Sequence, residues 1–311
     1  MKNNNFNINL LTDFGFKWIF GSERHKNNLI HFLNAFLPPY MGKVDDITFL
    51  PTEQLGLNDQ NKRLVFDVLC ASSKKDNFII EMQKVSQKFL YDRIIAYSSR
   101  LISNSLEVGD RKYNFPTILT IVLVDFEVPE LQASDKFLQH ITFKDDNNEI
   151  FSDKISFLLI DLTKFATKTD FRKLSDEEQK WCYVIKNMWR LKEGDIPAEE
   201  TVFWELYENC KLSKLSAMEK QEYEKSVLEY DDVKDAMEYH HILGREEGRA
   251  EGKEEGFSEG FDKGLETGID KGREEEKNLM IANMLENGIP IATIAKIAGM
   301  TEEEVRKCLA Q

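Results

Sequence analysis

Three polar side chains interrupt two apolar segments in the first third of the chain. Asp67 lies in VFDVLC (residues 65–70), and Glu81 and Gln83 lie in FIIEMQ (residues 78–83). Because successive side chains of a strand point to opposite faces, these three lie away from the most apolar face of their strands. Two carboxylates, with waters and a backbone carbonyl, are ligands that the hard cations Mg²⁺ and Mn²⁺ prefer. The two segments therefore indicate a candidate divalent-metal site.

The spacing of the two segments predicts that the carboxylates face each other. Residues 62–71 and 77–84 are separated by SSKKD, which favours a turn, so we expect a β-hairpin. If the turn centres near Lys74, Asp67 pairs with Glu81, and their Cβ atoms lie about 4.5–5.5 Å apart. Two like charges at that distance destabilise a sheet unless a cation neutralises them. A divalent metal ion could neutralise the pair. Alternatively, one carboxylate could form an ion pair with Lys62, Arg63 or Arg93.

Helices and strands alternate around this hairpin. Apolar residues at helical spacing predict helices, and short apolar or β-branched runs predict strands. The helices are expected at residues 25–36 and 86–107, and the strands at 46–53 (weakened by Pro51), 115–126, 137–143 and 155–161. The order of helix, strand, hairpin, helix and buried strand indicates an α/β layer arrangement.

The second half of the chain has a different character. It lacks strand signals, and we expect helices at residues 176–191, 198–212 and 216–243. Glycine then recurs at every fourth position from Gly244 to Gly272, between charged residues, in what we call the glycine segment (residues 244–276). Each glycine lowers helix propensity by about 1 kcal/mol. Such a helix needs a partner, as at an oligomer interface, unless the segment is a solvated connector; the sequence leaves both open.

The last residues, 278–311, contain two short helical patterns. Thr301 is the expected N-cap of the second, with Glu304 in the capping-box position. The pair superficially resembles a helix-turn-helix, but the second helix, TEEEVRKCL, begins with three glutamates where a DNA-reading helix usually offers donors. A small packing or assembly module is therefore favoured over DNA reading.

Charge and composition limit the possible partners and compartments. The formal net charge is −14, yet residues 62–112 carry ten Lys and Arg against six Asp and Glu, so a phosphate-binding surface is expected there. The sequence shows no run of about 18 apolar residues and no pattern of a secretory leader. We therefore expect neither a membrane-spanning helix nor secretion. The four cysteines lack zinc-ligand spacing. They indicate reduced thiols in the cytoplasm.

Taken together, several stretches resemble a known family. They are DFGFKWIFG (13–21), LIHFLNAFLP (29–38), VFDVLC (65–70), FIIEMQ (78–83), YDRIIAYSSRL (91–101) and FPTILTIVLVDF (115–126). Their order resembles the PD-(D/E)XK nuclease core and, more narrowly, the Rpn family of recombination-promoting nucleases and transposases. The resemblance covers about residues 10–240 and extends to the glycine-rich tail.

The resemblance implies an α/β fold, with a PD-(D/E)XK restriction-endonuclease-like core and a mostly α-helical C-terminal half. It also implies a metal-dependent endonuclease that cleaves double-stranded DNA. Asp67 and Glu81 would bind Mg²⁺ or Mn²⁺ together with the backbone carbonyl of Met82, and Gln83 would stand where the superfamily has lysine. We expect four segments: the nuclease-like core at 1–165, a helical extension at 166–243, the glycine segment at 244–276 and a small helical module at 277–311.

Further residues are implied as DNA contacts. Arg93 and Tyr97, one turn apart, match the family's R-x-x-x-Y and would face the site as phosphate contact and orienting hydroxyl; Lys84 and Lys17 are further candidate contacts. Asp13 and Lys17 match D-F-x-F-K, although helix capping and packing explain them equally well. Because Gln83 is uncharged, it cannot act as a base or hold the attacking water electrostatically. A catalytically silent DNA-binding or assembly protein is therefore the alternative. In either case we expect homo-oligomers formed through the C-terminal helices.

Overall fold

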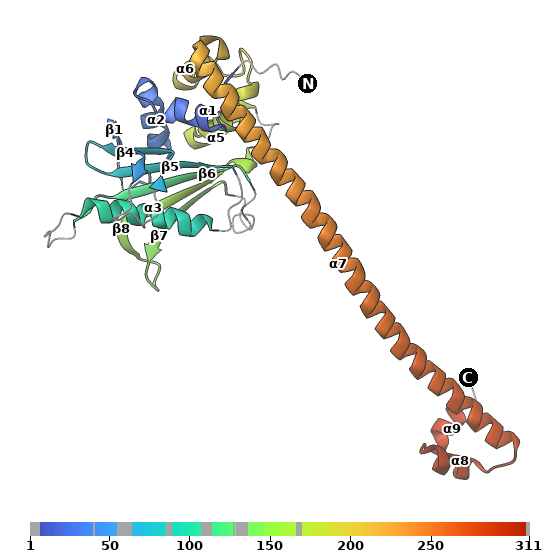
Figure 1. Cartoon of the computed structure of the whole chain (residues 1–311). Helices are drawn as coiled ribbons and strands as arrows, with labels where there is room; N and C mark the ends of the chain where they lie inside the picture. Colours follow the sequence, from blue (N-terminus) through green and yellow to red (C-terminus); the bar gives the residue numbers. More distant parts are fainter. Residues whose placement is uncertain are drawn as a thin grey trace. The chain divides into compact units, whose positions relative to one another are not determined.

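The computed structural model (Figure 1) describes residues 7–39, 41–54, 64–84, 89–106, 114–126, 128, 136–165 and 170–308. The chain forms two compact units, Met1–Met237 and Glu238–Gln311. The long helix α7 (Ala217–Glu286) begins in the first unit and ends in the second. None of the helices described has both the length and the apolar character needed to cross a membrane.

The first unit is built on a mixed sheet of six strands. Its strands, in spatial order, are β1 (Ile47–Phe49), β4 (Val68–Ser72), β5 (Asn77–Gln83), β6 (Ile118–Val124), β8 (Ile150–Asp161) and β7 (Leu138–Lys144). The strands β5, β6 and β8 run parallel to one another, and the other neighbours are antiparallel. A separate pair, β2 (Glu53–Gln54) with β3 (Leu64–Val65), lies next to them in sequence. All of β6, and β5 from Phe78 to Gln83, is buried, so these inner strands are covered on both faces.

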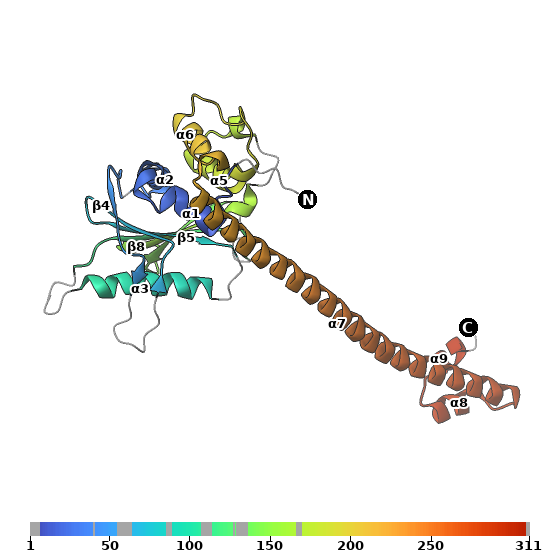
Figure 2. The same ribbon diagram turned by 45° about the horizontal axis from the view of Figure 1, so that its top comes forward.

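Helices lie on both faces of the sheet (Figures 1 and 2). The helix α3 (Leu90–Ser105) covers one face, and α1 (Asp13–Phe20), α2 (Lys26–Phe36) and α5 (Glu177–Asn187) cover the other. The helix α6 (Thr201–Asn209) packs into the same core as α5. The α1 side holds the larger apolar core, which includes the fully buried Trp181. The fold is the α/β fold with a PD-(D/E)XK-like core and a helical C-terminal half that the sequence predicted.

The hairpin forms in the predicted register. Val68 pairs with Ile80 and Leu69 with Ile79, so the next pair along is Asp67 with Glu81. The Ser72 hydroxyl accepts hydrogen bonds from two backbone N–H groups of the turn, and Lys75 adopts φ 69°. A short turn closed by its own side chain fixes the register of both strands.

Three expectations differ from the structure. Asp13–Phe20 forms a helix that the sequence analysis did not assign; Thr12 caps it by accepting from the Gly15 N–H at 3.0 Å. The strand expected at 46–53 ends at Phe49, because Pro51 cannot donate to a strand ladder. The strand expected at 155–161 begins five residues earlier, at Ile150, where it pairs with β7 as a hairpin.

In the second unit the glycine segment is helical throughout, as part of α7. A Cβ added to any glycine from Gly244 to Gly272 would meet nothing within 4 Å. The helices α8 (Ile291–Ala298) and α9 (Glu302–Cys308) pack with the end of α7 around a small core of Ile281, Ile294 and Val305. The capping box at Thr301 is confirmed, since the Thr301 N–H donates to the Glu304 carboxylate at 2.8 Å.

Candidate active site

The strand β5 places Glu81 and Gln83 on the sheet face that α3 covers. Alternate residues share a face, so Glu81 follows Ile79, which packs against Tyr97 and Leu101 of α3. Both polar side chains are buried, with Glu81 only 1% exposed and Gln83 5% exposed. Their face is thus a covered layer of the domain. The alternation identified the face correctly, and the resemblance had already placed Arg93 and Tyr97 of the following helix toward it.

The two carboxylates lie next to each other through direct contacts. The Asp67 N–H donates to Glu81 Oε1 at 3.1 Å, and the Met82 N–H donates to Asp67 Oδ2 at 2.8 Å. The Gln83 amide donates to the second oxygen, Glu81 Oε2, at 3.2 Å. The structure therefore brings Asp67, Glu81 and Gln83 together as one polar cluster at the point where β4 and β5 separate.

This cluster is electrostatically strained without a cation. Burial raises the pKa of Glu81 to about 8, and the charge of Asp67 adds to the shift. Burial also raises the pKa of Asp67, against the opposing hydrogen bond from Met82 and the charge of Lys17. Carboxyl groups whose pKa values are raised in this way are common at functional sites. The charge of Arg93 opposes the shift of Glu81, and a cation bound between the two carboxylates would offset their repulsion further.

The backbone of Met82 is directed to the same edge. Odd-numbered residues of β5 bond to β6, as shown by the Asn77 N–H donating to Thr117 and by Gln83 accepting from the Asp125 N–H. Met82 alternates with them, so its N–H and its carbonyl point away from β6, toward Asp67. Two carboxylates and one carbonyl suit a cation that completes its shell with water. In the described part of the chain no group of three or more His, Cys, Asp and Glu side chains could hold a metal ion.

The helix α3 contributes the arginine and tyrosine that the sequence singled out. Arg93 Nη2 lies 3.6 Å from Glu81 Oε2, and its Nε donates to the Tyr97 hydroxyl at 2.7 Å. The guanidinium also lies over the Tyr97 ring, 5.1 Å from the centroid. Tyr97 therefore fixes Arg93 beside the carboxylates. Of the three cations considered for an ion pair, Arg93 contacts Glu81, while Lys62 and Arg63 lie outside the described residues.

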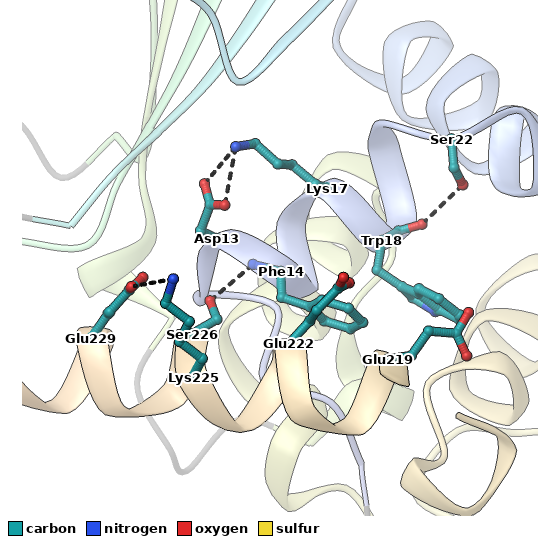
Figure 3. Close-up of a pocket in the computed structure, with 10 residues that line it drawn as sticks. All are labelled: Asp13, Phe14, Lys17, Trp18, Ser22, Glu219, Glu222, Lys225, Ser226 and Glu229. Carbon is teal, nitrogen blue, oxygen red and sulfur yellow. Dashed lines mark hydrogen bonds and ion pairs between the residues drawn. The ribbon is translucent and has the colours of Figure 1, made fainter. Parts of the chain in front are cut away.

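The remaining predicted residues lie on the other side of β5. On α1, Lys17 forms an ion pair with Asp13 at 2.9 Å, and both side chains are about half exposed. They line an open pocket of about 500 Å³ between α1 and the first turns of α7 (Figure 3), with Glu219, Glu222 and Glu229 on its rim. Neither Asp67 nor Glu81 lines this pocket. The acidic rim disfavours phosphate there.

Lys84 follows β5 directly and is half-buried. Burial lowers the pKa of its ammonium, while the charges of Asp13 and Asp67 oppose that shift. Its Nζ lies 5.9 Å from the ring centroid of Tyr230, on α7. Sequence reasoning missed Tyr230, because nothing local to a helix indicates contact with a strand so distant along the chain. Half of the predicted basic surface, namely Lys62, Arg63, Lys88, Arg111 and Lys112, lies outside the described residues.

The sequence profile of the PD-(D/E)XK nuclease family transposases matches residues 10–240, well over half of the chain. The chain belongs to this family. No curated protein and no solved structure gives a match. The family match spans α1, the whole sheet, α3 and the first turns of α7, and so includes every residue of the site described above.

Proposed function

We propose that the chain is a Mg²⁺- or Mn²⁺-dependent endonuclease that hydrolyses phosphodiester bonds of double-stranded DNA, in recombination or in the movement of mobile elements. The observation that carries the proposal is the contact of the buried Glu81 carboxylate with the backbone N–H of Asp67, whose half-buried carboxylate lies beside it. A purely structural pair of carboxylates would be destabilising there. The membership in a nuclease family supports the same reaction.

The residues present suit a hard divalent cation. Asp67, Glu81 and the Met82 carbonyl would hold it, and water and substrate oxygens would complete its shell. When bound, such an ion lowers the pKa of a water molecule and stabilises charge on the phosphoryl oxygens. The Gln83 amide keeps Glu81 oriented through its 3.2 Å hydrogen bond. It cannot accept or supply a proton in this reaction.

Arg93 is the proposed phosphate contact on the α3 side. Its Nε is engaged by Tyr97, which leaves the position of the guanidinium fixed before any substrate arrives. Preorganised positive charge of this kind stabilises a transition state without reorganisation at the moment of reaction. Tyr97 acts by orienting Arg93.

The test is nicking of supercoiled plasmid with and without Mg²⁺. We expect Asp67→Asn and Glu81→Gln each to lower the rate of Mg²⁺-dependent nicking more than about 100-fold. Loss of a residue that only hydrogen-bonds to a metal ligand usually lowers activity by about 10–100-fold. Glu259→Gln, in the exposed glycine segment, is the matched control and should be fully active. Activity retained in Asp67→Asn and Glu81→Gln would contradict the proposal. It would favour the silent DNA-binding or assembly protein, for which the Arg93–Glu81 ion pair is a structural contact.

We further propose that copies of the chain associate through the C-terminal helices. Four side chains of the glycine segment, Phe257, Phe261, Leu265 and Ile269, are 47–75% exposed and follow one another at intervals of four residues. Each follows a glycine, so a ridge of apolar side chains runs beside a groove without side chains. Ridges at this spacing pack into grooves at a crossing angle of about −50°. This geometry favours a short crossing of two helices over a long coiled coil.

A reducing compartment, the cytoplasm, is proposed for this activity. The thiols of Cys70, Cys182 and Cys210 are free and buried, and Cys308 is free as well. Burial raises the pKa of these core thiols, which keeps them protonated and unreactive. None of the four depends on an oxidising environment for a structural bond.

A further inference from the structure

Phe89 is an exposed aromatic residue one helical turn from Arg93. Its side chain is 63% exposed, and its carbonyl oxygen accepts a hydrogen bond from the Arg93 N–H at 3.0 Å, so it joins the first turn of α3. The next residue, Leu90, is 5% exposed and packs in an apolar cluster with β6 and β8. The backbone of Phe89 is therefore fixed to the domain, while its ring faces solvent.

Three further residues share the Phe89 side of α3. At 3.6 residues per turn, Phe89, Arg93, Ala96 and Arg100 fall within about 60° of one another around the helix. We call these four residues the outer stripe of α3. Arg93 Nη2 lies 3.6 Å from Glu81 Oε2, so the stripe reaches the carboxylate cluster directly.

The outer stripe lies on the flank of α3 that faces Asp67. Next to the stripe, the Tyr97 ring packs against Phe66 with the ring centroids 4.9 Å apart. The Tyr97 hydroxyl donates to the Val65 carbonyl at 3.5 Å. Val65 and Phe66 directly precede Asp67, and the Val65 side chain is 53% exposed. Of the two flanks of α3, the stripe therefore occupies the one beside the carboxylates.

The charge of the outer stripe suits a polyanion. Arg100 is partly exposed and pairs with no carboxylate among the residues that the structure describes. Asp92, the one carboxylate of α3, lies about 60° from Phe89 on the side away from Arg93. Arg93 and Arg100 are about 10.5 Å apart along the helix, and phosphates follow at about 3.4 Å per nucleotide of one strand. The two arginines thus match phosphates about three nucleotides apart.

We propose that α3 docks on duplex DNA through its outer stripe, and that Phe89 inserts into the base stack next to the phosphate that is cleaved. This rests on the proposed nuclease function and makes Phe89 a specificity-determining residue. Phe89 lies about 6 Å from Arg93 along the helix, which corresponds to one or two base steps. Apolar side chains that enter a base step unstack it and kink the duplex. Arg100 holds the next part of the same backbone.

The insertion of Phe89 selects DNA by its deformability. Unstacking requires less free energy at pyrimidine–purine steps, and least where a base is mismatched or unpaired. The substrate class that this surface favours is therefore duplex DNA with a weak or distorted step. No contact to the edge of a base is needed for this selection.

The first experiment compares cleavage of two duplex oligonucleotides that differ only in one central mismatch. Phe89→Ala should lower kcat on the fully paired duplex at least about 10-fold, because the other stripe residues are charged or small and cannot open a step. On the mismatched duplex the same variant should cleave within about 3-fold of the wild-type rate, because that step is already weak. Phe89→Trp keeps a flat apolar ring and should retain the rate on paired DNA. Phe151→Ala removes an 83% exposed phenylalanine of β8 and should leave both rates unchanged.

The second experiment measures binding, which does not depend on cleavage. In the Asp67→Asn background, anisotropy titrations should show at least about 10-fold tighter binding of the mismatched duplex than of the paired duplex. Phe89→Ala should abolish this preference. Arg100→Met should leave the preference intact and lower the salt slope of binding by about 1, because it removes one phosphate contact.

The results that would overturn the inference are separate from those that bear on the nuclease function. Equal losses of rate on both duplexes in Phe89→Ala, or a mismatch preference that survives this substitution, would show that the ring does not act on the base stack. An unchanged salt slope in Arg100→Met would overturn docking through the outer stripe. A wild-type protein that binds both duplexes but cleaves neither in Mg²⁺ would overturn the nuclease function. Loss of the mismatch preference in Phe89→Ala would then still demonstrate the insertion.

Discussion

The strand β5 and the glycine segment of α7 are the two most regular stretches of this chain, and they have opposite surroundings. Every residue of β5 from Phe78 to Gln83 is buried, whereas every residue of the glycine segment is exposed. In β5 a period of two separates an apolar face from a face that carries Glu81 and Gln83. In the glycine segment a period of four separates glycines that contact nothing from exposed apolar side chains.

The difference shows that a periodic pattern acquires function from what packs against it. In β5 the two faces meet different layers, α1 and α2 on one side and α3 on the other, so neighbouring residues have separate roles. No residue of the glycine segment is buried by the described part of the chain. The segment either packs against another chain, such as a second copy, or is a solvated connector that packs against nothing. Substitutions should therefore act strongly and individually in β5, and weakly and additively in the glycine segment.

The largest expected difference is in packing. Ile80→Ala, on the apolar face of β5, should lower the free energy of unfolding by about 2–5 kcal/mol, because it leaves a cavity in a closed core. Ile269 is 47% exposed, and Ile269→Ala should change the free energy of unfolding by no more than about 0.5 kcal/mol. Urea titration followed by circular dichroism measures both. An equally large loss at Ile269 would mean that the glycine segment is packed in solution.

Much of this contrast could be predicted from the sequence, and the reasons are local. The hairpin register followed from the position of the SSKKD turn, and Val68 pairs with Ile80 as the turn requires. The capping box at Thr301 followed from residue types three positions apart. Both depend on interactions between residues that are close along the chain.

The features that could not be predicted from the sequence depend on contacts between residues far apart along the chain. Alternation in β5 indicated which side Glu81 faces, but not how deeply it is buried. The helix of α1 was missed because Gly15 lies within it; the reason for that glycine is the backbone of Asn9, whose carbonyl oxygen lies only 2.1 Å from where a Cβ would be. The contact of Tyr230 with Lys84 joins a helix and a strand far apart in sequence. The roles assigned to the site residues and the four-segment division of the chain stay predictions.

The next expected effect is stabilisation by a divalent cation. An ion that binds only the folded protein raises the free energy of unfolding by RT ln(1 + [L]/Kd), about 2.7 kcal/mol at 100 times Kd. Thermal unfolding should therefore shift upward in Mg²⁺ or Mn²⁺. Asp67→Asn keeps the shape of the side chain but removes one charge, and Na⁺ at matched ionic strength controls for screening. A wild-type shift no larger than in these two controls would leave the Arg93–Glu81 ion pair as the better account of the carboxylates.

The raised pKa of Glu81 predicts that the free energy of unfolding depends on pH, with a smaller change per pH unit than the metal effect. Its pKa is raised from 4.5 to about 8 in the folded protein, so between these values the folded state binds more protons than the unfolded state. The titration of Glu81 should therefore lower the stability of the metal-free protein as pH rises from about 4.5 to about 8, by at most about 1.4 kcal/mol per unit, and the raised pKa of Asp67 adds a slope of the same sign. Unfolding titrations at several pH values measure the slope. Glu81→Gln should reduce the slope, whereas Glu259→Gln in the exposed segment should not; an equal slope in all three proteins would locate the titrating group elsewhere.

The smallest expected effect tests the glycine segment itself. Replacing Gly256, Gly260 and Gly264 by alanine adds three methyl groups where the chain offers them no contact. Each replacement should stabilise the isolated helix by about 1 kcal/mol, seen as slower hydrogen exchange in residues 250–270. If a second copy packs into the glycine groove, the same methyl groups prevent its close approach, and the mass from light scattering should fall. Ser258→Ala raises helix propensity without filling the groove, and should leave the mass unchanged. Slower exchange at an unchanged mass would show that the segment is a solvated connector, and that its regular glycines serve no contact between copies.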